Sequence, residues 1–380
     1  MPLWGRSAAK GTLALLLDRM RCIDGMPLAS HKPSAADIFA RKYQDIDPAD
    51  FQRSFVVKED IPADDSELPH RPVNTFHLIL DTRDPRYSCR NDVVIGPGNT
   101  VFYEDSIPFG EMSVRLRLLE KPRHVRGTVA YLSNTDPANY YHWLAFSLPL
   151  LGIYRDRLGI DPDYYYVGRS KQLFHLETLA RTGIRAERVL SDAVTADRLI
   201  ADFPDRRRRQ GAVDRAMLAF SRGLHFEPPA HPPTRRLFVG RRDASRRRLA
   251  NEDQCAEYAA RYGFETVSLD GRSVAEQAQL FAEAAFIIAP HGAALTNVLF
   301  ATAQASVLEL LPPRPPAVVP VHAPILTAFR EICAHVGCRY DYIFGVPLSA
   351  RQPVDQSRDN FAISMEEFCT KLATMLAGAG

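Results

Sequence analysis

Two runs of alternating strand-like and helix-like segments, joined by a proline-rich stretch, constrain the fold of this chain most strongly. One run begins at GTVAYL (127–132) and the other at RLFVG (236–240). Between them lies PPAHPPT (228–234), whose four prolines exclude both a helix interior and a central strand. Strands that alternate with helices form parallel sheets with crossover helices. The sequence therefore predicts an α/β protein with two halves.

Hydrophobic periodicity and helix-capping residues place the elements of each half. In the first half we expect strands at 127–132, 164–168, 187–190 and 198–203 and helices at 140–158 and 172–184. In the second half we expect strands at 236–240, 264–269, 286–290, 306–311 and 340–344 and helices from 251, at 273–284, at 323–336 and at 364–378. Capping pairs mark three of the helix starts: Asn251 with Gln254, Ser273 with Glu276, and Ser364 with Glu367.

The length of 380 residues suits two domains better than a single hydrophobic core. The first seventy residues combine mixed charge with several prolines and carry no chemistry that we can recognise. The predicted parts are an N-terminal extension, an N-terminal α/β domain, a linker, a C-terminal α/β domain and a C-terminal helical segment, which span 1–70, 71–227, 228–234, 235–350 and 351–380.

Composition excludes several classes of protein. With 46% hydrophobic and 24% charged residues, the chain has the balance of a folded globular protein and not of a disordered or collagen-like one. None of the six cysteines stands in a C-x-x-C pair, so we expect reduced thiols and no structural metal. The apolar run Leu13–Leu17 is too short for a signal peptide or a membrane span, which favours a cytoplasmic location.

Positive charge is concentrated in one region although the net charge is only +2, because thirteen arginines lie between Arg206 and Arg248. The stretch GRRDASRRRLANED (240–253) directly follows a predicted strand. Its arginines could bind a phosphate in bidentate fashion and neutralise it without a metal. Solvation explains Arg247 and Arg248 well enough. A nucleic-acid surface is an alternative, but few aromatic residues are interleaved with the charges.

The stretch APHGAALTNVLFA (289–301) passes from a buried strand into a helix through a histidine and a glycine. A helix that starts at the carboxyl end of a strand presents free N–H groups and the positive end of its dipole, which favour a diphosphate. Gly292 would let a phosphate approach the backbone, and the small Ala293 keeps the approach open. His291 could donate to a phosphate or a hydroxyl of the ligand, or it could simply cap the strand.

Two further residues stand out by their surroundings. Glu309 has apolar neighbours in VLEL, where a carboxylate is costly unless it finds hydrogen-bond donors. The hydroxyls of a nucleotide ribose, or a nearby arginine, would supply them. His142 in NYYHWL (139–144) begins an apolar helix. A histidine can act as a general base near neutral pH, although one on an apolar helix is often a satisfied core residue.

Four of these stretches together resemble one known family. NYYHWLAFSLPLL, GRRDASRRRLANEDQ, APHGAALTNVLFA and VLELL occur in the order and spacing of glycosyltransferase family 61, the capsular-polysaccharide type whose eukaryotic relatives transfer xylose or N-acetylglucosamine. The resemblance spans about residues 125–312, and its specificity comes from the joint match of four motifs that are each weak alone.

The resemblance implies a GT-B-like fold, in which two Rossmann-like domains face a cleft. It places the nucleotide-sugar donor in the C-terminal domain and the acceptor on the side of the N-terminal domain. It also implies an inverting reaction that needs no metal and no other cofactor. Motif position and side-chain chemistry together predict a donor site made of Arg241, Arg246, His291, Gly292, Ala293, Asn297 and Glu309. On the acceptor side they predict Asn139, His142 and Trp143.

The chain departs from the family pattern just after NYYHWL. An acidic residue and, beyond the next proline, a basic residue are often found there, whereas this chain has Phe146 and Leu150. If the acidic residue normally orients the histidine or acts as the base, the role of His142 as the base is open. Asp243 is then a second candidate for the catalytic base.

The expected function is the transfer of a sugar from a nucleotide-sugar, with UDP as the favoured nucleotide, to a polysaccharide or lipid-linked glycan. Such an acceptor would bring the cytoplasmic enzyme into peripheral contact with the inner face of the membrane, and no nucleic-acid partner is expected. The alternatives are a nucleotide- or glycan-binding protein of the same fold without catalysis, and a basic nucleic-acid-binding protein. A metal-dependent GT-A enzyme would need a D-x-D at the end of an apolar strand, and DPD (161–163) does not occupy such a place.

Overall fold

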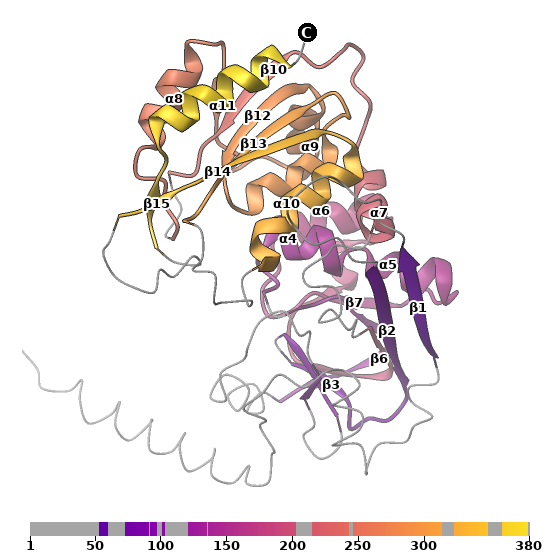
Figure 1. Cartoon of the computed structure of the whole chain (residues 1–380). Helices are drawn as coiled ribbons and strands as arrows, with labels where there is room; N and C mark the ends of the chain where they lie inside the picture. The colour runs from indigo at the N-terminus through magenta and orange to yellow at the C-terminus, as the bar shows by residue number, and fades with distance from the viewer. Residues whose placement is uncertain are drawn as a thin grey trace, which may run out of the picture.

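The computed structural model describes residues 53–59, 73–90, 92–96, 101–102, 121–134, 136–202, 215–242, 246–313, 323–348 and 359–378. The fold is mixed α/β with two main β-sheets, one in each half of the chain (Figure 1). Most of the predicted extension at 1–70, the arginine run at 206–209 and the candidate base Asp243 lie outside the described residues.

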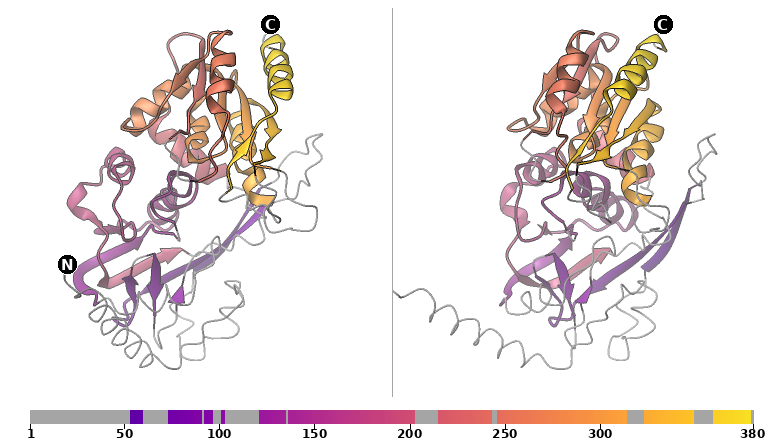
Figure 2. Two further views of the ribbon diagram at one scale, coloured as in Figure 1. Left: turned by 90° about the vertical axis from the view of Figure 1, so that its left-hand side faces the viewer. Right: turned by 60° about the vertical axis from the view of Figure 1, so that its left-hand side comes forward.

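The first sheet is mixed and curled (Figure 2). Strands β9, β6, β7 and β8 are parallel neighbours, whereas β2 and β3 pair with β9 in antiparallel fashion. The parallel part confirms the crossover pattern predicted for the first half. The strands are β1 (Arg53–Glu59), β2 (Val73–Thr82), β3 (Ser88–Arg90), β4 (Val93–Ile95), β5 (Val101–Phe102), β6 (Arg123–Tyr131), β7 (Tyr164–Tyr166), β8 (Val189–Leu190) and β9 (Val194–Asp202).

The helix predicted at 140–158 is helical but irregular. Pro149 lacks a backbone N–H and therefore interrupts the hydrogen-bond ladder in its middle. The segment consists of α4 (Tyr140–His142), the π-helical turn η4 (Trp143–Ser147), α5 (Leu150–Gly152) and the π-helical turn η5 (Ile153–Arg157). The other helices of this half are α6 (Leu173–Arg181), the short 3₁₀ turn η6 (Ala186–Arg188) and α7 (Arg215–His225).

The second sheet is entirely parallel, with the strand order β11-β10-β12-β13-β14. Its strands are β10 (Arg235–Val239), β11 (Glu265–Val267), β12 (Ala284–Pro290), β13 (Ser306–Leu311) and β14 (Arg339–Phe344). The helices are α8 (Glu252–Ala260), α9 (Val274–Ala282), the 3₁₀ helix η8 (Ala293–Phe300), α10 (Ala323–Val336) and α11 (Met365–Ala377), and a small antiparallel pair joins β15 (Val346–Pro347) to β16 (Phe361–Ala362). These elements confirm the prediction for the second half. None of the described helices combines the length and the hydrophobicity that a membrane span requires.

One predicted helix cap is wrong. The side chain of Asn251 does not cap α8. Its Nδ2 donates to the carbonyl oxygen of Ile363 (2.8 Å), and its Oδ1 accepts from the amide of the same residue (3.0 Å). An asparagine side chain can pair with both backbone groups of one residue, so Asn251 fastens the segment before α11 to the start of α8. At Ser273 the predicted capping box is present.

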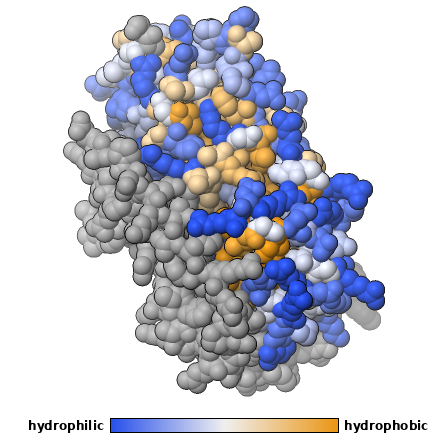
Figure 3. Space-filling view, turned by 90° about the vertical axis from the view of Figure 1, so that its right-hand side faces the viewer, coloured by the Kyte–Doolittle hydropathy of each residue, from blue (hydrophilic) through white to orange (hydrophobic). Residues whose placement is uncertain are grey.

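The helices between the two sheets pack into one shared layer (Figure 1). Helices α4, η4 and α7 from the first half contact η8 and α10 from the second, directly or through one another. The largest buried cluster accordingly runs from Ala130 and Ile200 in the first sheet, through Trp143, to Ile287 and Val307 in the second. On the opposite face of the second sheet lie α8 and α11. Seen from the side, the described parts of the two halves form a continuous surface (Figure 3).

Candidate functional site

The carboxyl edge of the second sheet brings three of the predicted donor-site residues together. Arg241 follows the end of β10, and His291 directly follows β12. Glu309 lies in β13, where the register pairs it with Ala289. The amide of His291 donates to the carbonyl oxygen of Leu310 (2.9 Å), which extends the ladder by one residue and fixes the backbone at this position. The parallel register therefore sets the histidine beside the carboxylate.

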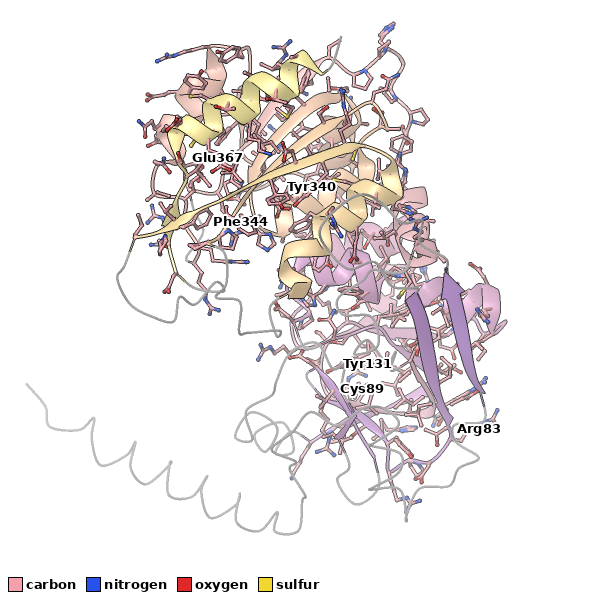
Figure 4. The ribbon with its side chains drawn as sticks, viewed as in Figure 1. Arg83, Cys89, Tyr131, Tyr340, Phe344 and Glu367 are labelled. Atoms are coloured by element: carbon pink, nitrogen blue, oxygen red, sulfur yellow. The ribbon has the colours of Figure 1, made fainter. Side chains whose placement is uncertain are left out.

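A buried hydrogen-bonded chain links His291, Glu309 and Tyr340. Nδ1 of the histidine lies 2.5 Å from Oε1 of Glu309, and the hydroxyl of Tyr340 donates to Oε2 (2.6 Å). Glu309 is only 1% exposed and His291 only 6%. Burial, together with the negative charge of Glu309, raises the pKa of Tyr340 well above its usual value, so this tyrosine keeps its proton. Tyr340 enters from β14, at the edge of the sheet (Figure 4).

Arg241 lies directly against Gly292. Its Nη1 donates to the carbonyl oxygen of His291 (2.7 Å), and its backbone amide donates to Oε1 of Glu252 (2.8 Å). A Cβ atom at Gly292 would clash with Nη1 of Arg241. The backbone of Gly292 is extended, with φ 168°, so the glycine is needed for the space it leaves and not for its conformational freedom. Burial, and then the neighbouring Arg247, lower the pKa of Arg241 to about 10, so its guanidinium stays charged at neutral pH.

Arg247 is the second cation of this edge, and the expectation that it is solvated is wrong. It is half-buried and has a left-handed backbone with φ 54°, which costs energy for a non-glycine residue. Burial and the charge of Arg246 lower its pKa, whereas the charge of Glu309 raises it. Within the described residues neither Arg241 nor Arg247 forms an ion pair with a carboxylate, and the Nε atoms of both are buried without an acceptor.

Other predicted donor-site residues have different surroundings. The side chain of Arg246 is exposed, and the backbone carbonyl oxygen of Arg246 lies 3.5 Å from Nη2 of Arg241. Ala293 is half-buried at the start of η8. Asn297 is fully buried: its Nδ2 donates to Oε1 of Gln277 (2.9 Å) and to a backbone carbonyl, and its Oδ1 accepts from the hydroxyl of Tyr140 (3.0 Å). The amide of Asn297 is thus used within the protein, where it joins α4 to η8.

The predicted acceptor-side residues lie at the start of α4, after the carboxyl end of β6. Asn139 caps this helix, since its Oδ1 accepts from the amides of Tyr141 (3.0 Å) and His142 (3.5 Å). Trp143 is a core residue, 1% exposed, and its indole N–H donates to the hydroxyl of Thr178 (2.9 Å). His142 is half-buried and contacts the rings of Tyr141 and Phe146 edge-on.

An aromatic bridge connects this helix to the donor-side edge. The ring of Phe329, from α10, lies 5.5 Å from the ring of Tyr141 and 5.2 Å from the ring of His291, measured between centroids. Phe329 therefore stands between the two histidine-bearing segments that the sequence singled out. It is buried, with 3% of its surface exposed.

Sequence reasoning missed Tyr340, Arg247, Glu252 and Phe329. Two of them carried a usable signal. The alternation in YDYIF (340–344) predicts that Tyr340 and Tyr342 share a face with the residue that β13 presents beside them, because side chains alternate along a strand. Arg247 lies in the same loop as Arg241 and could have been grouped with it. Glu252 and Phe329 sit on helices whose patterns point only to packing.

Comparison with known proteins bears on the middle of the chain. None of the curated proteins matches this sequence. The family model described as Glycosyltransferase 61 matches residues 140–308. The matched span runs from α4 through the arginine-bearing loop and η8 into β13, so it covers Arg241, Arg247 and His291 and ends one residue before Glu309. Residues 140–308 are therefore similar to glycosyltransferase family 61.

Proposed function

We propose that this protein is an inverting glycosyltransferase that takes its sugar from a nucleoside diphosphate-sugar. The observation that carries the proposal is the pair of half-buried cations, Arg241 and Arg247, which interact electrostatically and have no carboxylate partner among the described residues. Burying two like charges is costly unless an anion joins them. They lie at the carboxyl edge of a parallel sheet beside the start of η8, where open α/β sheets bind nucleotides.

The chemistry of the leaving group suits this arrangement. When the bond to the sugar breaks, negative charge develops on the diphosphate. Two preorganised guanidinium groups can hold that charge in a partly dry site, so we propose that the reaction needs no metal. The two carboxylates of DPD (161–163) are engaged within the protein. Oδ2 of Asp163 accepts from the amide of Thr128 (2.7 Å), and Asp161 forms an ion pair with Arg155 (3.2 Å).

The relation between the halves supports a GT-B-like division of labour, which we also propose. The segment after β6 and the segment after β12 meet where Tyr140 donates to Asn297. The donor would occupy the second half, and the acceptor would approach from the side of His142. We take the acceptor to be a polysaccharide, as in capsule synthesis, or a lipid-linked glycan at the inner face of the membrane. UDP is the first nucleotide to test.

Nucleotide binding tests the proposal most directly. Titration calorimetry with UDP, GDP and CDP should show binding of at least one of them to the intact protein. Arg247→Gln should weaken that binding about tenfold or more, because a charge-assisted hydrogen bond is worth about 1.5–3 kcal/mol. Arg248→Gln is the matched control, since its side chain is exposed in the same loop. No binding to any of the three, or equal binding by both variants, would refute the proposed donor site.

Turnover separates this proposal from its alternatives. Release of UDP from UDP-xylose or UDP-N-acetylglucosamine should survive EDTA if no metal takes part. Nucleotide binding without any release would favour a binding protein that has lost catalysis. Tight, salt-sensitive binding of duplex DNA or RNA with no effect of nucleotides would favour the nucleic-acid alternative.

A further inference from the structure

Proton transfer is the part of the reaction on which the geometry is most informative. We propose that His291 is the general base of the transfer and that Glu309 is a positioning residue that acts through it. This assignment rests on the proposed function and changes two roles at once. Glu309 does not bind the ribose, and the base comes from the donor-side half of the protein and not from His142.

Glu309 is poorly placed to bind a ribose. Its carboxylate is 1% exposed, and both oxygens already take hydrogen bonds, from Nδ1 of His291 at 2.5 Å and from the hydroxyl of Tyr340 at 2.6 Å. A ribose would have to reach below the histidine ring to find it. Two short hydrogen bonds offset the cost of burying this carboxyl group and leave neither oxygen in need of a ligand.

The same contacts decide which nitrogen of His291 carries the proton. Tyr340 keeps its proton and donates a hydrogen bond to Oε2 of Glu309, so Oε1 is left to accept from Nδ1–H of His291. In a neutral imidazole with the proton on Nδ1, the lone pair is on Nε2. Nε2 makes no hydrogen bond to any part of the chain that the structure describes, and it is not among the buried polar atoms without a partner. A lone pair with access to a ligand is therefore available at this atom.

The ring is also held in place. The backbone amide of His291 binds Leu310, its carbonyl oxygen binds Arg241, and its ring packs against Phe329. The charged and titratable groups around His291 and its two partners are Glu309 and Tyr340 from the sheet, Arg241 and Arg247 from the loop after β10, and Arg330 and Cys333 from α10. A carboxylate that fixes a histidine tautomer in this way is the arrangement by which serine hydrolases make a histidine accept a proton at its other nitrogen.

Atoms and electrons balance in the transfer step. The acceptor hydroxyl gives its proton to Nε2 of His291 while its oxygen bonds to the anomeric carbon. The bond from that carbon to the phosphate oxygen breaks, and its electron pair leaves with the nucleoside diphosphate. Arg241 and Arg247 hold the charge of the leaving group, and Glu309 stabilises the imidazolium. Once the products leave, the proton passes from the imidazolium to water.

Steady-state kinetics of the full chain, with UDP release from UDP-xylose or UDP-N-acetylglucosamine as the readout, test this assignment. His291→Gln and Glu309→Gln should each lower kcat about 100-fold or more, the usual contribution of a general base. Their affinity for UDP, measured by calorimetry, should stay within about twofold of the parent. Tyr340→Phe should have a smaller effect in the same direction. The matched control is Tyr342→Phe, two residues along the same strand and more exposed, which should leave kcat unchanged.

A pH profile distinguishes positioning from mere support of the fold. The acidic limb of kcat/KM should move to lower pH in Glu309→Gln, because the imidazolium has lost the negative charge beside it. A purely structural role would lower activity at every pH without moving the limb. In the parent protein, a strongly downfield proton resonance from Nδ1–H should vanish in His291→Gln and persist in His142→Gln, a readout that needs no turnover.

Three results would overturn the assignment. Glu309→Gln could raise the KM for the donor and weaken UDP binding while kcat is unchanged, as expected of a ribose ligand. His142→Gln could abolish turnover while His291→Gln retains it. The downfield resonance could be absent from the folded parent protein. All three are distinct from failure of the proposed function, which would appear as no nucleotide binding to the parent protein.

Discussion

The carboxyl edges of the two sheets share one backbone arrangement but differ in how their polar side chains are paired. Each leads from a parallel strand through a short loop into a helix: β6 into α4, and β12 into η8. In the first half, both ring nitrogens of the buried His175 have partners within the protein. His175 accepts at Nδ1 from the amide of Gln172 (3.1 Å), and its Nε2 lies 2.9 Å from the carbonyl oxygen of Pro137. In the second half Arg241 and Arg247 have no carboxylate partner among the described residues. His175 at the first edge is thus paired within the protein, whereas we propose that the second edge binds an anion.

Removal of one unpaired cation is the strongest test of this difference between the two edges. Arg241→Gln should lower kcat about 100- to 1,000-fold, because one preorganised donor to a developing charge is worth about 3–4 kcal/mol. The melting temperature should change little. Arg242→Gln is the control, since Arg242 is exposed and pairs with Asp253. UDP release by Arg241→Gln at nearly the parent rate would show that the cations do not serve the leaving group.

The buried, hydrogen-bonded His175 of the first half should make the stability of the protein sensitive to acid. Burial lowers the pKa of His175 to about 4 from a usual 6.5, so the folded state binds a proton less readily than the unfolded state. Stability from this group is therefore full above about pH 6.5 and declines as the pH falls towards 4, by about 3 kcal/mol in all. Urea unfolding at pH 7 and at pH 4.5 should show less acid sensitivity in His175→Gln than in the exposed-site control His231→Gln. An identical slope in both variants would rule out His175 as the cause.

A methyl group at Gly292 should displace the guanidinium of Arg241 while leaving its positive charge in the protein. Gly292→Ala would put a Cβ against Nη1 of Arg241, so we expect kcat to fall about 30-fold, or about 2 kcal/mol. Gly223→Ala is the matched control, because a Cβ there meets nothing within 4 Å and Gly223 lies inside α7. Helix propensity predicts that the control is slightly stabilised. If both variants turn over at the parent rate, the packing of Arg241 on Gly292 is irrelevant to catalysis.

The smallest effect concerns the link between the halves. Tyr140→Phe removes the hydrogen bond to Oδ1 of the fully buried Asn297 and leaves that acceptor without this donor. The free energy of unfolding should fall by about 1–2 kcal/mol. Denaturant unfolding would measure it, with the exposed Tyr342→Phe as reference. A drop of the same size in both variants would mean that the contact adds no stability.

How far the sequence predicts this molecule differs between the two edges. The order of strands and helices in both halves follows from hydrophobic periodicity and from the prolines at 228–234, because these report directly on burial and on forbidden backbone. The cluster of Arg241, His291 and Glu309 was predicted as well, since Arg241 and His291 follow neighbouring strands of one parallel sheet and Glu309 lies in the carboxyl half of the next strand.

The partners of those side chains could not be predicted. Glu309 was expected to meet a ribose or an arginine, yet it takes hydrogen bonds from His291 and Tyr340. That outcome depends on the lateral register of three strands, which periodicity does not reveal. Asn251 illustrates the same gap: its position predicts a helix cap, but the amide of a residue 112 positions away offered a better match to its side chain. Sequence periodicity reports which groups are buried, whereas tertiary contacts decide what they bind.

The shared helical layer has a consequence for how the chain could be divided. The loop at 228–234 looks like a convenient place to cut the protein into two pieces. Because the largest buried cluster contains residues from both sheets, each piece produced alone would expose a broad apolar surface to solvent. We expect the separated fragments to be poorly soluble and to recover a folded form only when they are refolded together. The proline-rich loop is a boundary in the sequence without being a boundary in the core.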